Sequence, residues 1–188
     1  EIGVAPDGLN INLGCGATHP ESLHEQVLKH KADLGIALDG DGDRALMIDH
    51  NGYILDGDEL LYIIVKDRIR RGTHTGGVVG TAMSNFGFEQ AIKALGIDFV
   101  RVPVGDRYIV SELAKRQWYL GGEPSGHIVC MQTTTGDGII TALQVLAAMQ
   151  TEKQSLATIR QGLTKFPQVI LNIRVNSQDD AIINKPRI

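Results

Sequence analysis

Short apolar segments alternate with amphipathic segments along most of this 188-residue sequence. Leu34 to Leu38 is an apolar run of strand length, and the preceding segment, 21–31, places its leucines and valine on one helical face. Helical segments of roughly 10–15 residues between strands are typical of α/β units. The alternation therefore predicts an α/β fold with mixed, mostly parallel sheets and flanking helices.

Apolar periodicity, turn residues and helix caps place the remaining elements. We expect strands at 10–13, 45–48, 76–80, 98–102, 118–120, 128–131 and 169–175. We expect further helices from 56 or 58 to about 70, and over 86–95, 108–116, 138–150 and 155–165. Asp106 and Asp137 are interpreted as N-caps of the helices that follow them.

Composition limits the classes of partner. The net charge is -4, so no basic surface predicts nucleic-acid binding. The longest apolar stretch, 139–149, is too short to span a membrane. Cys15 and Cys130 have no metal-ligand spacing, which favours reduced thiols in a cytoplasmic protein without a signal peptide. Nothing in the sequence determines the oligomeric state.

A cluster of carboxylates directly follows the apolar run at 34–38. Asp39, Asp41 and Asp43 are separated by Gly40 and Gly42. On an extended strand these side chains would be too far apart to share one ion, but glycine allows the backbone to curl and bring the oxygens together. Hard cations such as Mg²⁺ prefer oxygen ligands. The cluster therefore predicts a divalent-metal site.

The acidic cluster has other possible interpretations. A calcium-binding EF-hand loop requires Gly at its sixth position and Glu at its twelfth, where this sequence has Arg44 and His50. A solvated acidic turn between strands remains an alternative. Arg44 either neutralises the acidic cluster or faces a phosphate beside the metal.

Three further loops carry polar groups beside strands or helices. Residues 121–127, Gly-Gly-Glu-Pro-Ser-Gly-His, offer the donors and acceptors that a sugar requires, or form an ordinary polar turn. Residues 104–108 place Arg107 at a helix N-terminus, where it could contribute to an anion site. Residues 133–138 precede a helix and either cap it or hold an anion through backbone amides.

Two of these loops together resemble the α-D-phosphohexomutase superfamily. Its metal loop has the form Asp-Gly-Asp-Gly-Asp-Arg, as at 39–44, and its sugar loop has the form Gly-Glu-x-Ser-Gly-His, as at 122–127. Residues 81–85, 104–108 and 133–138 are similar to the bacterial branch that acts on glucosamine phosphates. The resemblance covers essentially the whole chain.

The resemblance implies a reaction that moves a phosphoryl group between the 6- and 1-positions of a hexose. The donor is a phosphoserine, and the intermediate is a bisphosphorylated sugar. In the branch named above, glucosamine 6-phosphate and glucosamine 1-phosphate are interconverted for the synthesis of UDP-N-acetylglucosamine and the cell wall. The substrate partner is then a hexosamine phosphate, and the cofactor is Mg²⁺.

The resemblance also implies roles for individual residues and a division into domains. Residues 1–53 correspond to the later part of a second domain, 54–165 to a third, similar domain, and 166–188 to the approach to a fourth. The implied roles are metal ligation by Asp39, Asp41 and Asp43, sugar contacts by Glu123, Ser125 and His127, substrate contact by Arg107, and a catalytic role for Arg44.

Two parts of the family pattern are missing. The phosphoserine loop should lie far upstream of the metal loop, but Ala17-Thr18-His19-Pro20 lacks its serine and lies too close. The phosphate-binding loop of the fourth domain is also absent. Since the first residue is Glu1 rather than Met, we expect a central fragment without mutase activity of its own.

Three alternatives remain open. The substrate could be a glucose or mannose phosphate, as for other members of the superfamily. A haloacid-dehalogenase-like phosphotransferase would use Asp39 as nucleophile and Asp41 beside it, although Asp43 does not fit that motif. The chain could also be a non-catalytic module that binds sugar phosphates.

Overall fold

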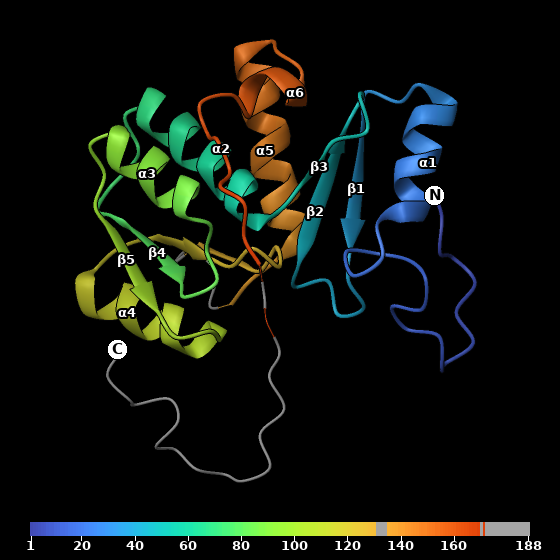
Figure 1. The fold of residues 1–188 in the computed structure, drawn as a ribbon, viewed down its shortest axis with the longest axis horizontal. Coiled ribbons are helices and arrows are strands. Elements are labelled where there is room, and N and C mark those ends of the chain that lie inside the picture. Colours follow the sequence, from blue (N-terminus) through green and yellow to red (C-terminus); the bar gives the residue numbers. More distant parts are fainter. Residues whose placement is uncertain (131–134, 170, 172–188) are drawn as a thin grey trace, which may run out of the picture.

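The computed structural model describes residues 1–130, 135–169 and 171, and its strands form two β-sheets (Figure 1). The strands are β1 (Leu34–Leu38), β2 (Ala45–Asp49), β3 (Ile54–Leu55), β4 (Val78–Thr81), β5 (Phe99–Val102), β6 (Leu120–Gly122) and β7 (Ile128–Cys130). The first sheet has the order β1-β2-β3 and is antiparallel. The second has the order β5-β4-β6-β7, in which β5, β4 and β6 are parallel and β7 is antiparallel to β6. The mixed α/β architecture is confirmed, with parallel pairing confined to the second sheet.

Helices cover both sheets. They are α1 (Glu21–His30), α2 (Gly57–Arg70), α3 (Phe86–Ala94), α4 (Asp106–Arg116), α5 (Gly138–Glu152) and the short α6 (Leu156–Ile159). In Figure 1, α2 and α3 lie on one side of the second sheet and α4 on the other, while α5 stands between α2 and the first sheet. Helix α1 packs closely on β1. A Cβ added at Gly35 would lie only 2.7 Å from the side chain of Val27.

Side-chain caps mark where α2 and α5 begin, whereas α4 has no such cap. Asp56 forms a capping box with Glu59 at the start of α2, and Asp137 accepts a hydrogen bond from the N–H of Ile140 in α5. The prediction for Asp106 is wrong, because the N-cap of α4 is Gly105 and Asp106 is already helical. Gly105 has φ of +128°, a conformation that favours glycine. The helix begins at Asp106, two residues before the expected start at 108.

Two other predicted elements differ from the structure. Residues 10–13 form a turn rather than a strand, closed by a hydrogen bond of 3.1 Å from the N–H of Leu13 to the carbonyl of Asn10. The helix expected over 155–165 is reduced to α6, and Gly162 beyond it has φ of +106°. The strand expected over 169–175 lies mostly outside the described residues, and Val169 and Leu171 are not in a strand.

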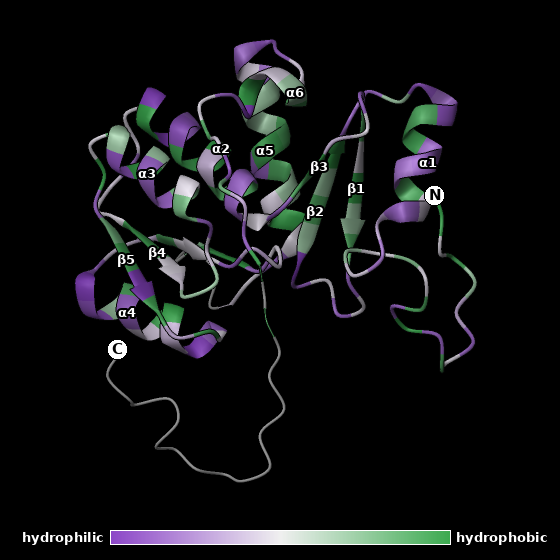
Figure 2. Ribbon diagram, in the orientation of Figure 1, coloured by the Kyte–Doolittle hydropathy of each residue, from purple (hydrophilic) through white to green (hydrophobic). Residues whose placement is uncertain are grey.

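Buried apolar side chains form two clusters. The larger includes residues of both sheets, among them Met47 on β2, Leu61 on α2, Val78 on β4 and Val145 on α5. The smaller consists of Val79, Ile109, Leu113 and Val129. Figure 2 shows the corresponding hydrophobic colouring on the strands of the first sheet and along α5. Interiors of this kind are close-packed, so the loops that follow these strands are held in fixed relative positions. None of the described helices combines the length and hydrophobicity that a membrane span requires.

Candidate functional site

The metal loop, Asp39 to Arg44, joins the antiparallel strands β1 and β2. Its turn is closed by a hydrogen bond of 3.1 Å from the N–H of Gly42 to the carbonyl of Asp39, and Gly42 has φ of +73°. This geometry brings one carboxylate oxygen each of Asp39, Asp41 and Asp43 within 4.8 Å of one another. The convergence that the Asp/Gly alternation predicts is therefore present.

Neighbouring segments hold the loop from two sides. A Cβ at Gly40 would lie 2.2 Å from Ile11, so the turn at 10–13 packs directly on the loop. On another side, the N–H of Gly138 at the start of α5 donates to the carbonyl of Gly42 at 2.8 Å. A Cβ at Gly138 would lie 2.7 Å from the carbonyl oxygen of Arg44, so only glycine allows the helix to approach this closely.

Arg44 is the cation paired with the first carboxylate. Its backbone N–H and its Nε donate to the two oxygens of Asp39, at 3.0 and 2.5 Å. Burial acts to raise the pKa of Asp39, but the hydrogen bonds and the charge of Arg44 outweigh it and lower that pKa. Asp39 is therefore held ionised, and Arg44 neutralises part of the acidic loop.

Asp43 is less well compensated. Burial raises its pKa, and the negative charges of Asp39 and Asp41 act in the same direction against His127. Its Oδ1 is buried without a hydrogen-bond partner among the described residues and lies 3.5 Å from Nε of Arg44. Convergent carboxylates with one orphaned oxygen fit a hard divalent cation, which prefers oxygen ligands.

The sugar loop, Gly122 to His127, is attached to the metal loop through the backbone. The N–H of Ala45, the first residue of β2, donates to the carbonyl of Gly126 at 3.1 Å, and Arg44 and His127 form an isolated β-bridge. A Cβ at Gly126 would lie 2.2 Å from the carbonyl oxygen of Ala45. The tertiary structure therefore brings together two loops that are about 80 residues apart in sequence.

Glu123 and Ser125 line a cavity of about 400 Å³ at the carboxyl edge of the parallel strands. Oε1 of Glu123 accepts a hydrogen bond from the N–H of Gly105 at 2.9 Å, and Oγ of Ser125 lies 3.3 Å from its Oε2. These contacts fix the carboxylate at the cavity wall. The cavity is lined by Thr81, Met83, Val104, Glu123, Pro124, Ser125 and Gln168.

Two predicted sugar or anion contacts lie elsewhere. His127 is 5% exposed and is absent from the cavity lining; its Nδ1 lies 3.0 Å from Oδ2 of Asp43. Arg107 is also absent from the lining, with its guanidinium 4.6 Å above the ring of Tyr108 and a hydrogen bond to that hydroxyl. In the loop 133–138, Thr133 and Thr134 lie outside the described residues, and Asp137 caps α5.

Several cavity residues were not predicted as site residues. Thr81 is the last residue of β4 and Val104 follows β5, just as the predicted residue Glu123 follows β6. Ligands of α/β sheets bind outside the carboxyl ends of parallel strands, so the position of Thr81 and Val104 at strand ends was a usable signal. Gln168 had no such signal, because its place depends on how the chain returns after α6.

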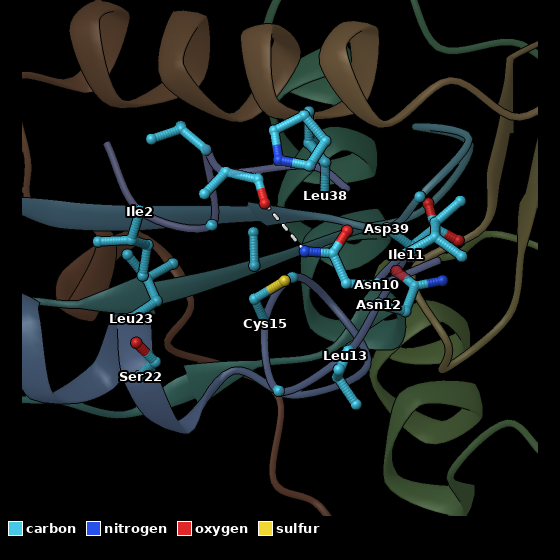
Figure 3. Close-up of a pocket in the computed structure, with 18 of the residues that line it drawn as sticks. Ile2, Asn10, Ile11, Asn12, Leu13, Cys15, Ser22, Leu23, Leu38 and Asp39 are labelled. Atoms are coloured by element: carbon cyan, nitrogen blue, oxygen red, sulfur yellow. Dashed lines mark hydrogen bonds between the residues drawn. The ribbon is translucent and has the colours of Figure 1, made fainter. Parts of the chain in front are cut away.

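A larger cavity of about 1040 Å³ lies between the N-terminal segment and β1 (Figure 3). Figure 3 shows Cys15 and Leu23 among its lining residues, with Ile11 and Asn12 toward the end nearest Asp39. The cavity adjoins the metal loop at Asp39 and Gly40 and shares no lining residue with the cavity of Glu123 and Ser125.

The family model of phosphoglucomutase/phosphomannomutase, alpha/beta/alpha domain III, matches residues 56–166. The chain belongs to this family. It is 54% identical over 182 residues to a phosphoglucosamine mutase of Psychromonas ingrahamii, which covers 96% of this chain and 41% of that protein. It is 58% identical over 174 residues to one of Aeromonas hydrophila, covering 92% and 39%. The chain thus spans about two fifths of the length of these phosphohexomutase relatives.

Solved structures of phosphohexomutases share the fold. A phosphomannomutase of Thermus thermophilus aligns with a TM-score of 0.70 at 24% identity, over 76% of this chain and 33% of that one. An Aspergillus fumigatus N-acetylphosphoglucosamine mutase in complex with GlcNAc-6P and magnesium aligns with a TM-score of 0.65 at 20% identity, over 83% and 41%. Because the chain belongs to the α-D-phosphohexomutase superfamily, the alternative of a haloacid-dehalogenase-like phosphotransferase is wrong.

Proposed function

We propose that this chain supplies the metal-binding and sugar-binding loops of a phosphoglucosamine mutase. The observation that carries the proposal is the backbone hydrogen bonding between the metal loop and the sugar loop. Carboxylates at 39–43 converge to within 4.8 Å, and the next residues hydrogen-bond to the loop that presents Glu123 and Ser125. A metal and a hexosamine phosphate bound there would lie next to each other, as transfer of a phosphoryl group requires.

Asp39, Asp41 and Asp43 would hold Mg²⁺. The ion would offset negative charge on the phosphoryl group during transfer. Arg44 keeps Asp39 ionised through its hydrogen bonds, so this ligand is available at neutral pH without losing a proton. About a third of the Arg44 side chain is exposed, which supports the proposal that its remaining donors face a phosphate.

Glu123 and Ser125 would orient the sugar. The carboxylate of Glu123 is fixed by the N–H of Gly105, so it presents acceptors for hydroxyl or ammonium groups in a constant direction. Ser125 is exposed at the same wall and offers both a donor and an acceptor. Arg107, exposed at the N-terminus of α4, would approach the phosphate only after leaving its contact with Tyr108.

The choice of glucosamine phosphate, rather than a glucose or mannose phosphate, rests on the curated relatives. Proteins 54–58% identical over most of this chain carry the name phosphoglucosamine mutase. The solved N-acetylphosphoglucosamine mutase complex with magnesium supports Mg²⁺ as the ion. The proposal includes a cytoplasmic location and leaves the two-domain division at about residue 53 as a prediction.

Titration of the 188-residue chain with glucosamine 6-phosphate, with and without Mg²⁺, tests the proposal. Amide NMR shifts are expected at Glu123 and Ser125 in both titrations, and at 39–44 only when Mg²⁺ is present. Asp41→Asn should weaken the Mg²⁺-dependent shifts and leave the shifts at Glu123. Absence of any shift at Glu123 and Ser125 would exclude a sugar role for their loop. An equal response to mannose 6-phosphate would exclude the preference for glucosamine.

A further inference from the structure

Gln168 lines the same cavity as Glu123 and Ser125, although it comes from a different part of the fold. Glu123 and Ser125 belong to the loop after β6, whereas Gln168 lies in the segment that follows α6. The other polar side chain in the lining is that of Thr81, whose Oγ1 already accepts a hydrogen bond from the N–H of Met83 at 3.3 Å. Gln168 is therefore the exposed polar group that the described residues add to the cavity wall outside the sugar loop.

The segment that carries Gln168 is held by Asn85, the N-cap residue of α3. Oδ1 of Asn85 accepts a hydrogen bond from the N–H of Phe166 at 2.9 Å, and its Nδ2 donates to the carbonyl of Phe166 at 2.8 Å. The ring of Phe166 also packs edge-on against that of Phe86, with centroids 5.5 Å apart. Because the backbone is fixed two residues before Gln168, the fold determines where this side chain lies.

The amide of Gln168 has a defined orientation. Its Nε2 donates to the carbonyl of Met83 at 3.2 Å. A carbonyl only accepts hydrogen bonds, so the nitrogen of the amide, and not its oxygen, must face Met83. Oε1 lies 3.5 Å from Nδ2 of Asn85, which is a long hydrogen bond. The side chain therefore keeps one N–H and much of the acceptor capacity of Oε1 for another group.

The loop after β4, to which this amide is attached, is braced by Arg101 on β5. Nη1 of Arg101 donates to the carbonyl of Ser84 at 2.7 Å and to that of Thr81 at 3.0 Å. Its Nε donates to Oε2 of Glu89 on α3 at 2.8 Å. A group presented from a rigid loop loses little freedom when it binds a ligand. The amide of Gln168 is thus prepared for a contact inside the cavity.

We propose that Gln168 is a further specificity-determining residue, which hydrogen-bonds to a hydroxyl group of the hexose from a second wall of the cavity. This inference rests on the proposed sugar site. A hydroxyl both donates and accepts, so it matches an amide that has a free N–H and a carbonyl oxygen. An ammonium group only donates and is better matched by the carboxylate of Glu123. Because positions 1 and 6 react, the hydroxyl that Gln168 contacts is at position 3 or 4.

The side-chain amide of Gln168 provides a direct test in the wild-type chain of 188 residues. Its NMR signals are assigned by their loss in Gln168→Ala. Titration with glucosamine 6-phosphate should shift these signals together with the backbone amides of Glu123 and Ser125. The side-chain amide of Gln161 is the control, since this residue is exposed and absent from the cavity lining, and its signals should not shift.

Affinity measurements identify the hydroxyl. Gln168→Ala should weaken the binding of glucosamine 6-phosphate roughly 3–10-fold, as expected for the loss of hydrogen bonds between neutral groups. Glucose 6-phosphate should lose the same factor, because the amino group is not involved, and Gln161→Ala should lose nothing. The 3-deoxy and 4-deoxy forms of glucosamine 6-phosphate are then compared. Wild type and Gln168→Ala should bind equally well the form that lacks the partner hydroxyl.

The outcomes separate the inference from the proposed function. If glucosamine 6-phosphate shifts Glu123 and Ser125 but not the side chain of Gln168, the inference is wrong and the sugar role of the loop stands. If none of the three responds, the proposed sugar site fails and the inference fails with it. An affinity loss in Gln168→Ala that persists with both deoxy forms would also overturn it.

Gln168→Ala might act by displacing its segment, and the backbone amides of Asn85 and Phe166 in the free variant report this. If they move, the wild-type titration of the Gln168 side chain decides, because it requires no substitution.

Discussion

Two groups of carboxylates follow strands of the first sheet. Their negative charge is neutralised by different parts of the chain. The metal loop after β1 brings together Asp39, Asp41 and Asp43, with Arg44 as their paired cation among the described residues. The second group lies where β3 meets α2, at 56–59, and has cations from the segment after α6.

The carboxylates of the second group form ion pairs with residues that are distant in the sequence. Nζ of Lys165 lies 2.5 Å from Oδ2 of Asp56 and 3.5 Å from Oε2 of Glu59. Arg160 lies 3.8 Å from Oε1 of Glu59 and stacks over the ring of Tyr53. Burial raises the pKa of Glu59, with the charge of Lys165 acting against it. These contacts attach the segment that leaves α6 to the start of α2.

The difference between the groups teaches what a carboxylate cluster requires to be a metal site. Buried charges are costly unless they are paired. At 56–59 the chain supplies cations for Asp56 and Glu59. Oδ1 of Asp43 and Oδ1 of Asp58 are both buried without a hydrogen-bond partner among the described residues, so an unpaired oxygen alone does not mark a metal site. In the described part of the chain, the metal loop is the group whose ligand atoms converge. A divalent ion would supply the missing charge.

The largest expected effect concerns Asp58, the carboxylate in the second group that forms no salt bridge with any described residue. It accepts a hydrogen bond of 2.7 Å from the N–H of Asn85, and burial raises its pKa from 3.8 to about 7. Since the folded pKa lies above the unfolded one, the penalty is absent below about pH 4, grows as the pH rises, and is complete above about pH 7. Urea unfolding of wild type and Asp58→Asn should show their free-energy difference changing by about 4 kcal/mol between pH 4 and pH 8. A difference independent of pH would show that Asp58 remains ionised when folded.

Lys165→Met removes the nearest cation of the second group. Glu59 would keep a buried charge with a weaker partner, so we expect the free energy of unfolding at pH 7 to fall by about 3 kcal/mol, near the low end for a broken buried pair because Lys165 is partly exposed. Lys115→Met, at a mostly exposed lysine, is the matched control and should change stability by less than about 0.5 kcal/mol. Equal effects would contradict the structural role of the second group.

Gly138→Ala tests the packing of α5 on the metal loop. The added Cβ would lie 2.7 Å from the carbonyl oxygen of Arg44 and 2.9 Å from that of Gly42, so the helix or the loop must move. We expect a loss of about 2 kcal/mol, typical of overpacking, together with weaker Mg²⁺ binding. Thermal unfolding and calorimetry measure the two effects. Unchanged Mg²⁺ affinity would mean that the loop geometry does not depend on this contact.

The smallest expected effect is a gain in the free energy of unfolding, whereas Lys165→Met and Gly138→Ala are expected to lower it. Asp41→Asn removes an exposed carboxylate that repels its neighbours, so the metal-free chain should gain about 0.5 kcal/mol. The same change removes a ligand, and addition of Mg²⁺ should stabilise the variant less than wild type. Thermal unfolding in EDTA and in Mg²⁺ compares the two. A variant less stable in EDTA would mean that the metal loop is compensated in the same manner as the second group.

Much of the local structure could be predicted from the sequence. The apolar run at 34–38, the Asp/Gly alternation after it, and the cap at Asp137 are local signals, and each gave an element or turn that the structure contains. For the helix expected to begin at 56 or 58, the structure has Asp56 as the N-cap. The expected helix over 155–165 is shorter than predicted, since beyond α6 the chain instead places Arg160 and Lys165 against carboxylates about 100 residues earlier in the sequence. The periodicity of apolar residues in a short segment does not predict ion pairs with residues far away in the sequence.

The sequence by itself determined the chemistry available: three carboxylates, two glycines that let them converge, and a loop with Glu123 and Ser125. Only the tertiary structure decided which groups meet. It placed His127 against Asp43 instead of in the cavity lining, and it completed that cavity with Thr81 and Gln168. The physical reason is that ligand convergence at 39–43 is a property of one short turn, whereas the other contacts depend on how the two sheets pack on a shared apolar cluster.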